Sequence, residues 1–340
     1  MKQHSITLYG MSTEGISLVS GIFKAENFYI IDETTRLATL YDRRSGFSGY
    51  SSEILDLVPE EEAIKNSRII VFGPKIKSNL ELGSLTFHLK QISEKIRKDQ
   101  QLINIIPVDK GRNEQMIETI EAVSGLSAGK EFGYHYFPYG SSRVMASNYE
   151  GKKEEWMASS GDMEGSEERF LIESLDSFSE KFRKVWLKRK LEMYYSYYVK
   201  GYYTLSLAAN SFGKESPLTN LAKVMIKSID DFADSILDGI KKKIKELSIK
   251  PVKAVIYLVW DVDQYELLGE SEYFRARFVD KLNEYFSQTK LMTIDKLESI
   301  ILNYQLSKEE ILLVCDEISE SRIKDKVDPQ KLLKCQNQSG

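Results

Sequence analysis

The chain has 340 residues, of which 42% are hydrophobic and 29% charged, and its formal net charge is -4. This length is enough for about two or three domains with hydrophobic cores, and the composition indicates a soluble globular protein. The balance of charge argues against a general nucleic-acid-binding protein, because such proteins carry surplus Lys and Arg for the phosphates.

The segment from Ser5 to Asp32 has the order of a dinucleotide-binding βαβ unit. An apolar run at 6–9 predicts a strand, and a helical pattern follows the turn after it. A second apolar run, 28–31, predicts another strand that ends at Asp32. A glycine turn before a helix is also common in other α/β proteins, so the motif alone is weak. The candidate cofactor-binding residues are Gly10, Met11, Ser12, Thr13, Glu14, Gly15 and Asp32.

Each part of this unit has an expected physical role. Gly10 allows a sharp turn after the strand, and Gly15 allows the helix to pack close to the sheet. The helix N-terminus offers N–H groups and a positive dipole end to a pyrophosphate. Asp32 is placed to accept hydrogen bonds from ribose hydroxyls. Ser12 stands at the usual middle glycine, so its side chain is expected to crowd the pyrophosphate.

Strands and helices alternate through the rest of the first half of the chain, which predicts a parallel sheet with right-handed crossovers. Residues 43–52 and 141–165 are expected to be loops. We expect helices at 34–41, 60–65, 80–98 and 113–123, and strands at 68–72, 101–107 and 132–137.

The middle of the chain is predicted to be helical, with helices at 167–182 and 218–247 and a break at 212–217. Between them, residues 184–210 lack proline and are expected to form a central helix dense in tyrosine. Aromatic residues on several faces indicate a helix buried between domains or subunits. Ligand stacking is the alternative, but aromatic area more commonly serves packing.

Pro251 opens a second α/β region. Its expected strands are 252–260, 290–294 and 311–315, and its expected helices are 273–286 and 294–304. From Lys324 the chain is polar and expected to fray. The predicted fold class is α/β, with an N-terminal Rossmann-like parallel sheet, long central helices and a smaller C-terminal Rossmann-like α/β domain. The predicted boundaries are 1–165, 166–248, 249–325 and a polar tail at 326–340.

The two cysteines, Cys315 and Cys335, both lie near the C-terminus, and the three histidines are far apart. This pattern predicts a reducing compartment without a disulfide framework, and no metal site. We expect Cys315 to be a small core residue. No signal peptide and no apolar run long enough to span a membrane is found, so a cytoplasmic protein is expected.

Several stretches resemble the UDP-glucose/GDP-mannose dehydrogenase family over residues 5–140. After the βαβ unit, the strand ending at Gly73-Pro74 is similar to the family's strand and Val-Pro turn, which adds Pro74 to the cofactor-binding candidates. Residues 105–111 resemble the strand and turn near the nicotinamide, and 124–133 resemble the family's S-G-L-x-A-G-x-D-F stretch. The resemblance implies two Rossmann-like domains joined by a central helix, NAD as cofactor, a nucleotide sugar as substrate and a homodimer formed through that helix.

The departures from the family fall where its chemistry occurs. Tyr139 replaces the glutamate after a proline, and Asn104-Ile105 replaces a Ser-Thr pair. Lys190 is the nearest candidate for the catalytic lysine, with Tyr194 where the family has asparagine. Ser216 stands at the nucleophile's position, where the family has cysteine. The resemblance is therefore to a divergent member that lacks the catalytic cysteine.

Two hypotheses follow. The first is an NAD-dependent oxidoreductase that converts a nucleotide-sugar alcohol to an aldehyde, with Lys190 or Lys200 as the base if burial lowers its pKa. A full four-electron oxidation is not expected without the thiol. The second is a descendant that kept the fold but lost the catalysis, and acts as a binding, regulatory or assembly protein. We favour the second, because function must be argued from the site and not from the fold.

Overall fold

The computed structural model describes residues 5–25, 27–42, 57–76, 82–138, 163–187, 193–303 and 306–336. The chain forms two compact units. The N-terminal unit comprises Met1–Ser174, Ser206–Thr219 and Tyr265–Gly269. The C-terminal unit comprises Leu175–Leu205, Asn220–Gln264 and Glu270–Gly340.

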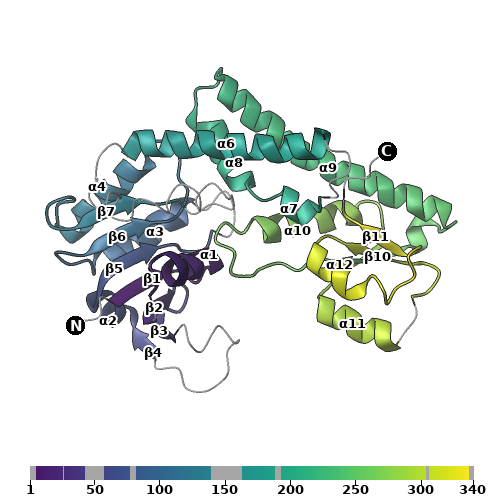
Figure 1. Cartoon of the computed structure of the whole chain (residues 1–340), viewed down its shortest axis with the longest axis horizontal. Coiled ribbons are helices and arrows are strands. Elements are labelled where there is room, and N and C mark those ends of the chain that lie inside the picture. The colour runs from purple at the N-terminus through teal and green to yellow at the C-terminus, as the bar shows by residue number, and fades with distance from the viewer. Residues whose placement is uncertain are drawn as a thin grey trace. The chain divides into compact units, whose positions relative to one another are not determined.

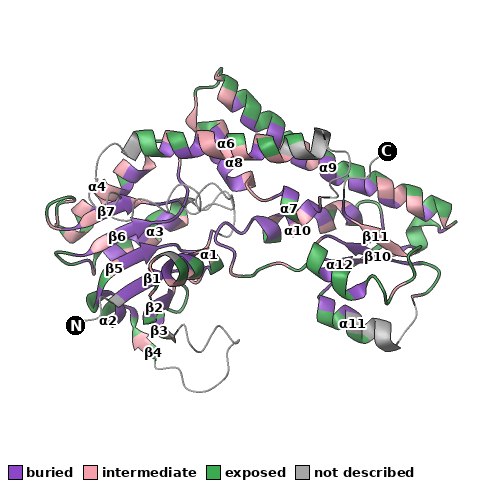
Figure 2. Cartoon of the chain, viewed as in Figure 1, coloured by how far each residue is buried: buried purple, intermediate pink, exposed green. Residues whose placement is uncertain are grey.

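The N-terminal unit is built on a seven-stranded sheet of order β4-β3-β2-β1-β5-β6-β7 (Figure 1). The neighbours β2, β1, β5, β6 and β7 run parallel, whereas β3 and β4 are antiparallel at one edge. Figure 2 shows that the central strands are largely buried, as expected for a parallel sheet between layers of helices. The strands are β1 (Ser5–Tyr9), β2 (Asn27–Asp32), β3 (Leu37–Asp42), β4 (Leu57–Pro59), β5 (Ser67–Phe72), β6 (Gln101–Asn104) and β7 (Gly133–Tyr136).

Helices connect the parallel strands largely where the sequence predicts them. The helix after β1 starts as α1 (Thr13–Ser17) and continues as a π-helical turn, η1 (Leu18–Ile22). Gly125, at φ 71°, ends α4. The other helices that lie wholly in this unit are α2 (Glu60–Lys65), α3 (Leu82–Ser93) and α4 (Arg112–Ser124). Helix α8 (Tyr202–Ser211) belongs to it from Ser206 onward.

The predicted helix at 34–41 is wrong. Strand β3 occupies Leu37–Asp42 and pairs antiparallel with β2, so a hairpin replaces a crossover helix. The tight turn before it includes Arg36 at φ 61°, a left-handed conformation that a helix does not contain. Thr39 and Tyr41 favour a strand, and pairing with β2 decides between the two structures. The predicted loop at 43–52 and residues 141–162 of the predicted loop at 141–165 lie outside the described residues. The last three residues of that loop prediction, 163–165, are wrong, because they form the start of helix α6 (Met163–Leu187).

Helix α6 (Met163–Leu187) confirms the helix predicted at 167–182. Its buried residue Glu167 accepts hydrogen bonds from the backbone N–H groups of Gly111 and Asn113, at 2.5 and 2.8 Å. These are N–H groups at the start of α4, which have no partner within that helix. The carboxylate therefore fixes the beginning of α4 against α6.

The predicted continuous helix at 184–210 is wrong, because the chain breaks at Gly201, where φ is 101°. A short helix, α7 (Tyr195–Tyr198), precedes the break, and α8 follows it. The buried carboxylate of Glu270 accepts hydrogen bonds from the N–H groups of Gly201 and Tyr203, at 2.9 and 2.7 Å. The break therefore has its own buried hydrogen-bond partner. The long helix α9 (Pro217–Glu246) confirms the prediction of 218–247.

The tyrosines around α7 pack inside the C-terminal unit. Tyr195 is 2% exposed, and its ring lies 5.4–6.3 Å from the rings of Phe232, Trp260, Phe274 and Phe278. These edge-on and tilted contacts bury aromatic surface within one unit. The aromatic segment therefore packs against its own chain, and the predicted role in a dimer stays a prediction.

The C-terminal unit has a four-stranded parallel sheet of order β11-β10-β8-β9 (Figure 1). Its strands are β8 (Val255–Val259), β9 (Gln288–Met292), β10 (Glu310–Val314) and β11 (Leu332–Lys334). Its helices include η3 (Pro251–Lys253), α10 (Glu270–Asn283), α11 (Ile294–Asn303) and α12 (Glu317–Ile323). One face of the sheet packs in a core of Tyr257, Val259, Met292, Ile294, Leu297, Leu312, Val314 and Ile323.

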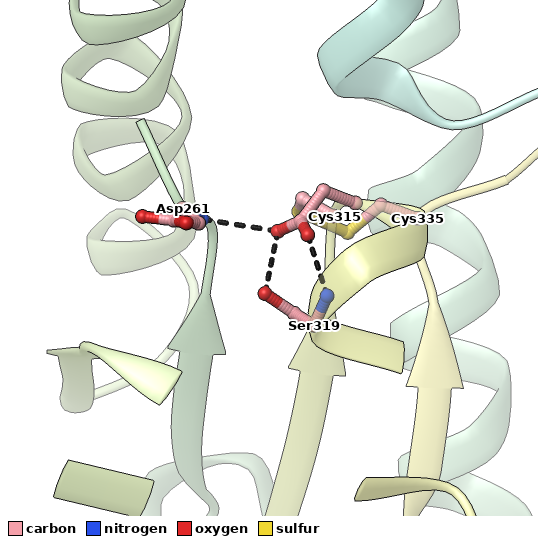
Figure 3. The surroundings of a disulfide bond; sticks show 5 residues. Asp261, Cys315, Ser319 and Cys335 are labelled. Carbon is pink, nitrogen blue, oxygen red and sulfur yellow. Dashed lines mark hydrogen bonds between the residues drawn. A yellow bond between two sulfur atoms is a disulfide. The ribbon is translucent and has the colours of Figure 1, made fainter. Parts of the chain in front are cut away.

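Two expectations about the C-terminus are wrong. Strand β11 lies in the segment expected to fray, because it pairs in parallel with β10. This pairing brings Cys335 to the end of β10, and Cys315 and Cys335 form a disulfide with a Cα–Cα distance of 4.7 Å (Figure 3). The sequence did not predict the disulfide, because the polar residues around Cys335 do not show the apolar pattern of a strand. Among the described residues, no helix is long and apolar enough to cross a membrane.

Candidate functional site

The turn after β1 has the backbone geometry that its glycines predict. Gly10 has φ 102°, and a Cβ atom there would lie 2.2 Å from the carbonyl oxygen of Gly73. Pro74 lies beside the same turn, since the Cβ atom would be 2.5 Å from its Cα. At Gly15, a Cβ atom would meet the side chain of Leu8 at 2.7 Å. Glycine is therefore required at position 10, whereas a side chain at position 15 would force Leu8 or Ser12 to shift. The structure also brings Pro74 next to the fingerprint.

Ser12 is fully buried and is the N-cap residue of α1. Its hydroxyl accepts a hydrogen bond from the N–H of Gly15 at 3.2 Å, and its own N–H donates to the carbonyl of Gly10 at 3.2 Å. The serine at the usual glycine position therefore caps the helix. These bonds occupy the N–H groups of Ser12 and Gly15, which a bound phosphate would otherwise contact.

The N–H groups of Met11, Thr13 and Lys75 also have acceptors within the N-terminal unit. Met11 donates to Oε2 of Glu33 at 3.2 Å, and Lys75 donates to Oε1 of the same carboxylate at 3.1 Å. Thr13 donates to the carbonyl of Tyr265 at 2.9 Å. Sequence reasoning missed Glu33 and Tyr265, because neither belongs to the fingerprint and Tyr265 is far along the chain.

The segment Tyr265–Gly269 is held against this turn by further bonds. The N–H of Leu267 donates to Oε2 of Glu14 at 2.9 Å, and its carbonyl accepts from Ile76 at 2.8 Å. The Leu267 side chain is fully buried. Glu14, predicted to lie at a cofactor site, therefore holds a segment of its own chain.

Asp32 ends β2 as predicted, but its carboxylate takes part in the hairpin turn. Oδ1 accepts hydrogen bonds from the N–H groups of Thr34 and Thr35, at 2.8 and 3.3 Å. Such bonds are typical of an aspartate that stabilises a turn. The structure therefore gives Asp32 a role in the turn, and its predicted bond to a ribose stays a prediction.

A dinucleotide does not fit this arrangement of the turn. A pyrophosphate needs N–H donors at the start of the helix, whereas those of Met11, Ser12, Thr13 and Gly15 have acceptors in the chain. The Glu33 carboxylate would also place a negative charge beside the phosphates.

Of the predicted catalytic residues, the structure describes Ser216. Lys190 lies outside the described residues. Ser216 is partly exposed in the turn before α9, where its hydroxyl accepts from the N–H of Leu218 at 3.3 Å and its N–H donates to Gly213 at 2.8 Å. These are local bonds of a helix start. Lys200, the alternative base, lies at the break between α7 and α8.

Lys181 is a cation that sequence reasoning did not single out. Burial lowers the pKa of its ammonium group to about 8, with a contribution from Lys200, while Glu270 acts in the opposite direction. Its Nζ donates to the carbonyl of Lys200 at 3.2 Å and lies 4.7 Å from the centre of the Tyr197 ring. A lysine with this pKa can exchange a proton near neutral pH.

In the C-terminal sheet, β8 and β10 are parallel neighbours, and Asp316 is the second residue after the end of β10. Its Oδ2 accepts from the N–H of Asp261 at 3.0 Å and from the hydroxyl of Ser319 at 2.8 Å. Oδ1 accepts from the N–H of Ser319 at 2.7 Å. The ends of the two strands and the start of α12 thus share one carboxylate.

No protein-family model and no curated protein matches the chain. Its structure is similar to a UDP-D-ManNAc dehydrogenase from Pyrococcus horikoshii, at 13% identity and TM-score 0.58, covering 98% of this chain and 95% of that one. It is also similar to a UDP-glucose dehydrogenase from Pyrobaculum islandicum, at 10% identity and TM-score 0.60, covering 98% and 94%. The chain therefore has the fold of the nucleotide-sugar dehydrogenases, as its sequence motifs implied.

Proposed function

We propose that this chain is a nucleotide-sugar dehydrogenase-like protein that does not perform the four-electron oxidation of a nucleotide sugar. The observation that carries the proposal is the state of its sulfur atoms. The sequence contains two cysteines, and both are fully buried in one disulfide. The second oxidation passes through a covalent thiohemiacetal, which requires a thiolate. Neither sulfur is available as that nucleophile.

The environment of Asn104 supports the same conclusion. This residue stands where the resemblance implies a hydroxyl near the reacting carbon. It is fully buried, and its amide donates to the side-chain oxygen of Asn113 at 3.2 Å. Its own oxygen accepts from the N–H of Ile106 at 3.0 Å. Asn104 therefore serves the internal polar network of the sheet rather than a substrate.

In this proposal the protein acts as a binding, regulatory or assembly protein. A nucleotide sugar as ligand and a homodimer remain parts of this proposal. NAD, expected from the resemblance, is not part of it, because the N–H groups of the turn after β1 already have acceptors in the chain. The expected cytoplasmic location is not part of it either, because disulfides are rare in a reducing compartment. The fold of two UDP-sugar dehydrogenases supports the nucleotide sugar as the first ligand class to test.

The test is an assay of the full chain with NAD and a panel of UDP- and GDP-sugars, following the absorbance of reduced NAD. We expect no reduction beyond that in a control without protein. Sustained reduction of two NAD per sugar would refute the proposal. If reduction occurs, Ser216→Ala and Lys200→Ala variants would show which of the two side chains the activity needs.

A further inference from the structure

We infer that both Rossmann-like sheets have filled their own phosphate positions with carboxylates, Glu33 in one and Asp316 in the other, so that neither accepts a nucleotide phosphate there. The inference deepens the proposed function, since it concerns binding as well as catalysis.

In the N-terminal sheet, β1 and β5 are the neighbours at which the strand order reverses direction. Open α/β sheets bind their ligands outside the carboxyl ends of the strands at such a point. Glu33 spans this point, because its two oxygens accept from Met11, which follows β1, and Lys75, which follows β5. An anion bridging N–H groups of two strand ends is the arrangement that a bound phosphate would have.

The Tyr265–Gly269 segment closes the same place from another side. Its Tyr265 carbonyl takes the N–H of Thr13, the first residue of α1. The segment is anchored by the bonds of Leu267 to Glu14 and Ile76, and by the complete burial of the Leu267 side chain. A dinucleotide would have to displace this segment as well as Glu33.

The C-terminal sheet shows the same device independently. Its order, β11-β10-β8-β9, places the reversal between β8 and β10. Asp316, directly after Cys315 at the end of β10, accepts from the N–H of Asp261 beyond the end of β8 (Figure 3). The same carboxylate caps α12 through Ser319. The N–H groups at this switch point again have an internal anion as acceptor.

The first experiment measures binding to the full chain by isothermal titration calorimetry, with NAD, inorganic pyrophosphate and UDP as probes. We expect no saturable heat with any probe. Hydrogen exchange followed by mass spectrometry would then map any ligand found. Protection of the peptides containing Met11 and Lys75 by NAD or pyrophosphate would overturn the inference for the first sheet. Protection of the peptide containing Asp261 by UDP would overturn it for the second.

The second experiment tests the internal anion directly. Glu33→Gln and Glu33→Ala should speed exchange of the Met11 and Lys75 amides at least tenfold, whereas Glu118→Ala, an exposed carboxylate on α4, should not. Unchanged exchange in both Glu33 variants would refute the bridge. NAD binding that protects the Met11 and Lys75 peptides, without turnover, would defeat this inference alone, whereas reduction of two NAD per sugar would defeat the proposed function as well.

Discussion

The disulfide between Cys315 and Cys335 should contribute measurably to the stability of the C-terminal unit. The two residues are separated by 20 positions in sequence. For a closed loop of this length, the chain-entropy account gives a loss of denatured-state entropy worth about 3 kcal/mol at 25 °C. We therefore expect the Cys315→Ala/Cys335→Ala variant to lose about 3 kcal/mol of unfolding free energy in this unit.

Fluorescence of Trp260 offers a local probe, because this residue is 2% exposed and its ring lies 5.5 Å from that of Tyr195 in the same unit. The other two tryptophans, Trp156 and Trp186, are replaced by phenylalanine so that the signal comes from one residue. Urea unfolding is then measured for the parent and the double alanine variant, each with and without a reductant.

The parent should lose stability when the reductant is present, and the double variant should be insensitive to it. An equal midpoint for the parent in both buffers, after reduction has been verified by thiol counting, would refute the reasoning. A reductant-sensitive midpoint in the variant that lacks both cysteines would show that the effect does not come from this bond.

Three further predictions concern other sites. Gly10→Ala should prevent stable folding of the N-terminal unit, because Gly10 has φ 102° and its new Cβ would lie 2.2 Å from the Gly73 carbonyl oxygen. The control Gly21→Ala should leave the melting temperature nearly unchanged, because nothing lies within 4 Å of a Cβ added there. Leu267→Ala should cost about 2–5 kcal/mol, measured by thermal unfolding, since this side chain is fully buried; a loss below 1 kcal/mol would contradict the docking of its segment. Burial opposes ionisation of Glu310, but hydrogen bonds from its neighbours outweigh this effect and lower its pKa. Its contribution to stability is therefore present above the unfolded pKa of about 4.3 and is lost as the pH falls through the lowered value. Glu310→Gln should flatten the dependence of the urea midpoint on pH below about 5, and parallel curves for the parent and the variant would contradict this.

The sequence predicts the alternation of elements well, because apolar runs and glycine turns are local signals. The strand that ends at Phe72 and the helix from Pro217 to Glu246 both follow from residue periodicity. The hairpin of β2 and β3 could not be predicted in this way. Leu37–Asp42 becomes a strand because β2 offers an edge to pair with, and pairing is a property of the fold.

The candidate site was predicted in outline only. Gly10 and Gly15 are identifiable because their roles depend on the absence of a side chain at a fixed place in the turn. Glu33 and Tyr265 carry no such signal. Glu33 reaches the turn through the hairpin after β2, and Tyr265 reaches it through a segment far along the chain. Both contacts therefore depend on the folded chain. Cys335 was missed for the same reason, since only the pairing of β11 brings it to Cys315.

The proposed loss of the nucleophile and the proposed closure of the phosphate positions are separate changes. A protein that lacked only the thiol could still hold NAD and reduce it once, and a protein whose turn was closed could still keep a reactive cysteine. In this chain the two sulfurs are bound to each other, and carboxylates bridge the strand ends of both sheets. In our two proposals together, the chain keeps the fold of the nucleotide-sugar dehydrogenases, and its partner binds elsewhere than at the two phosphate positions.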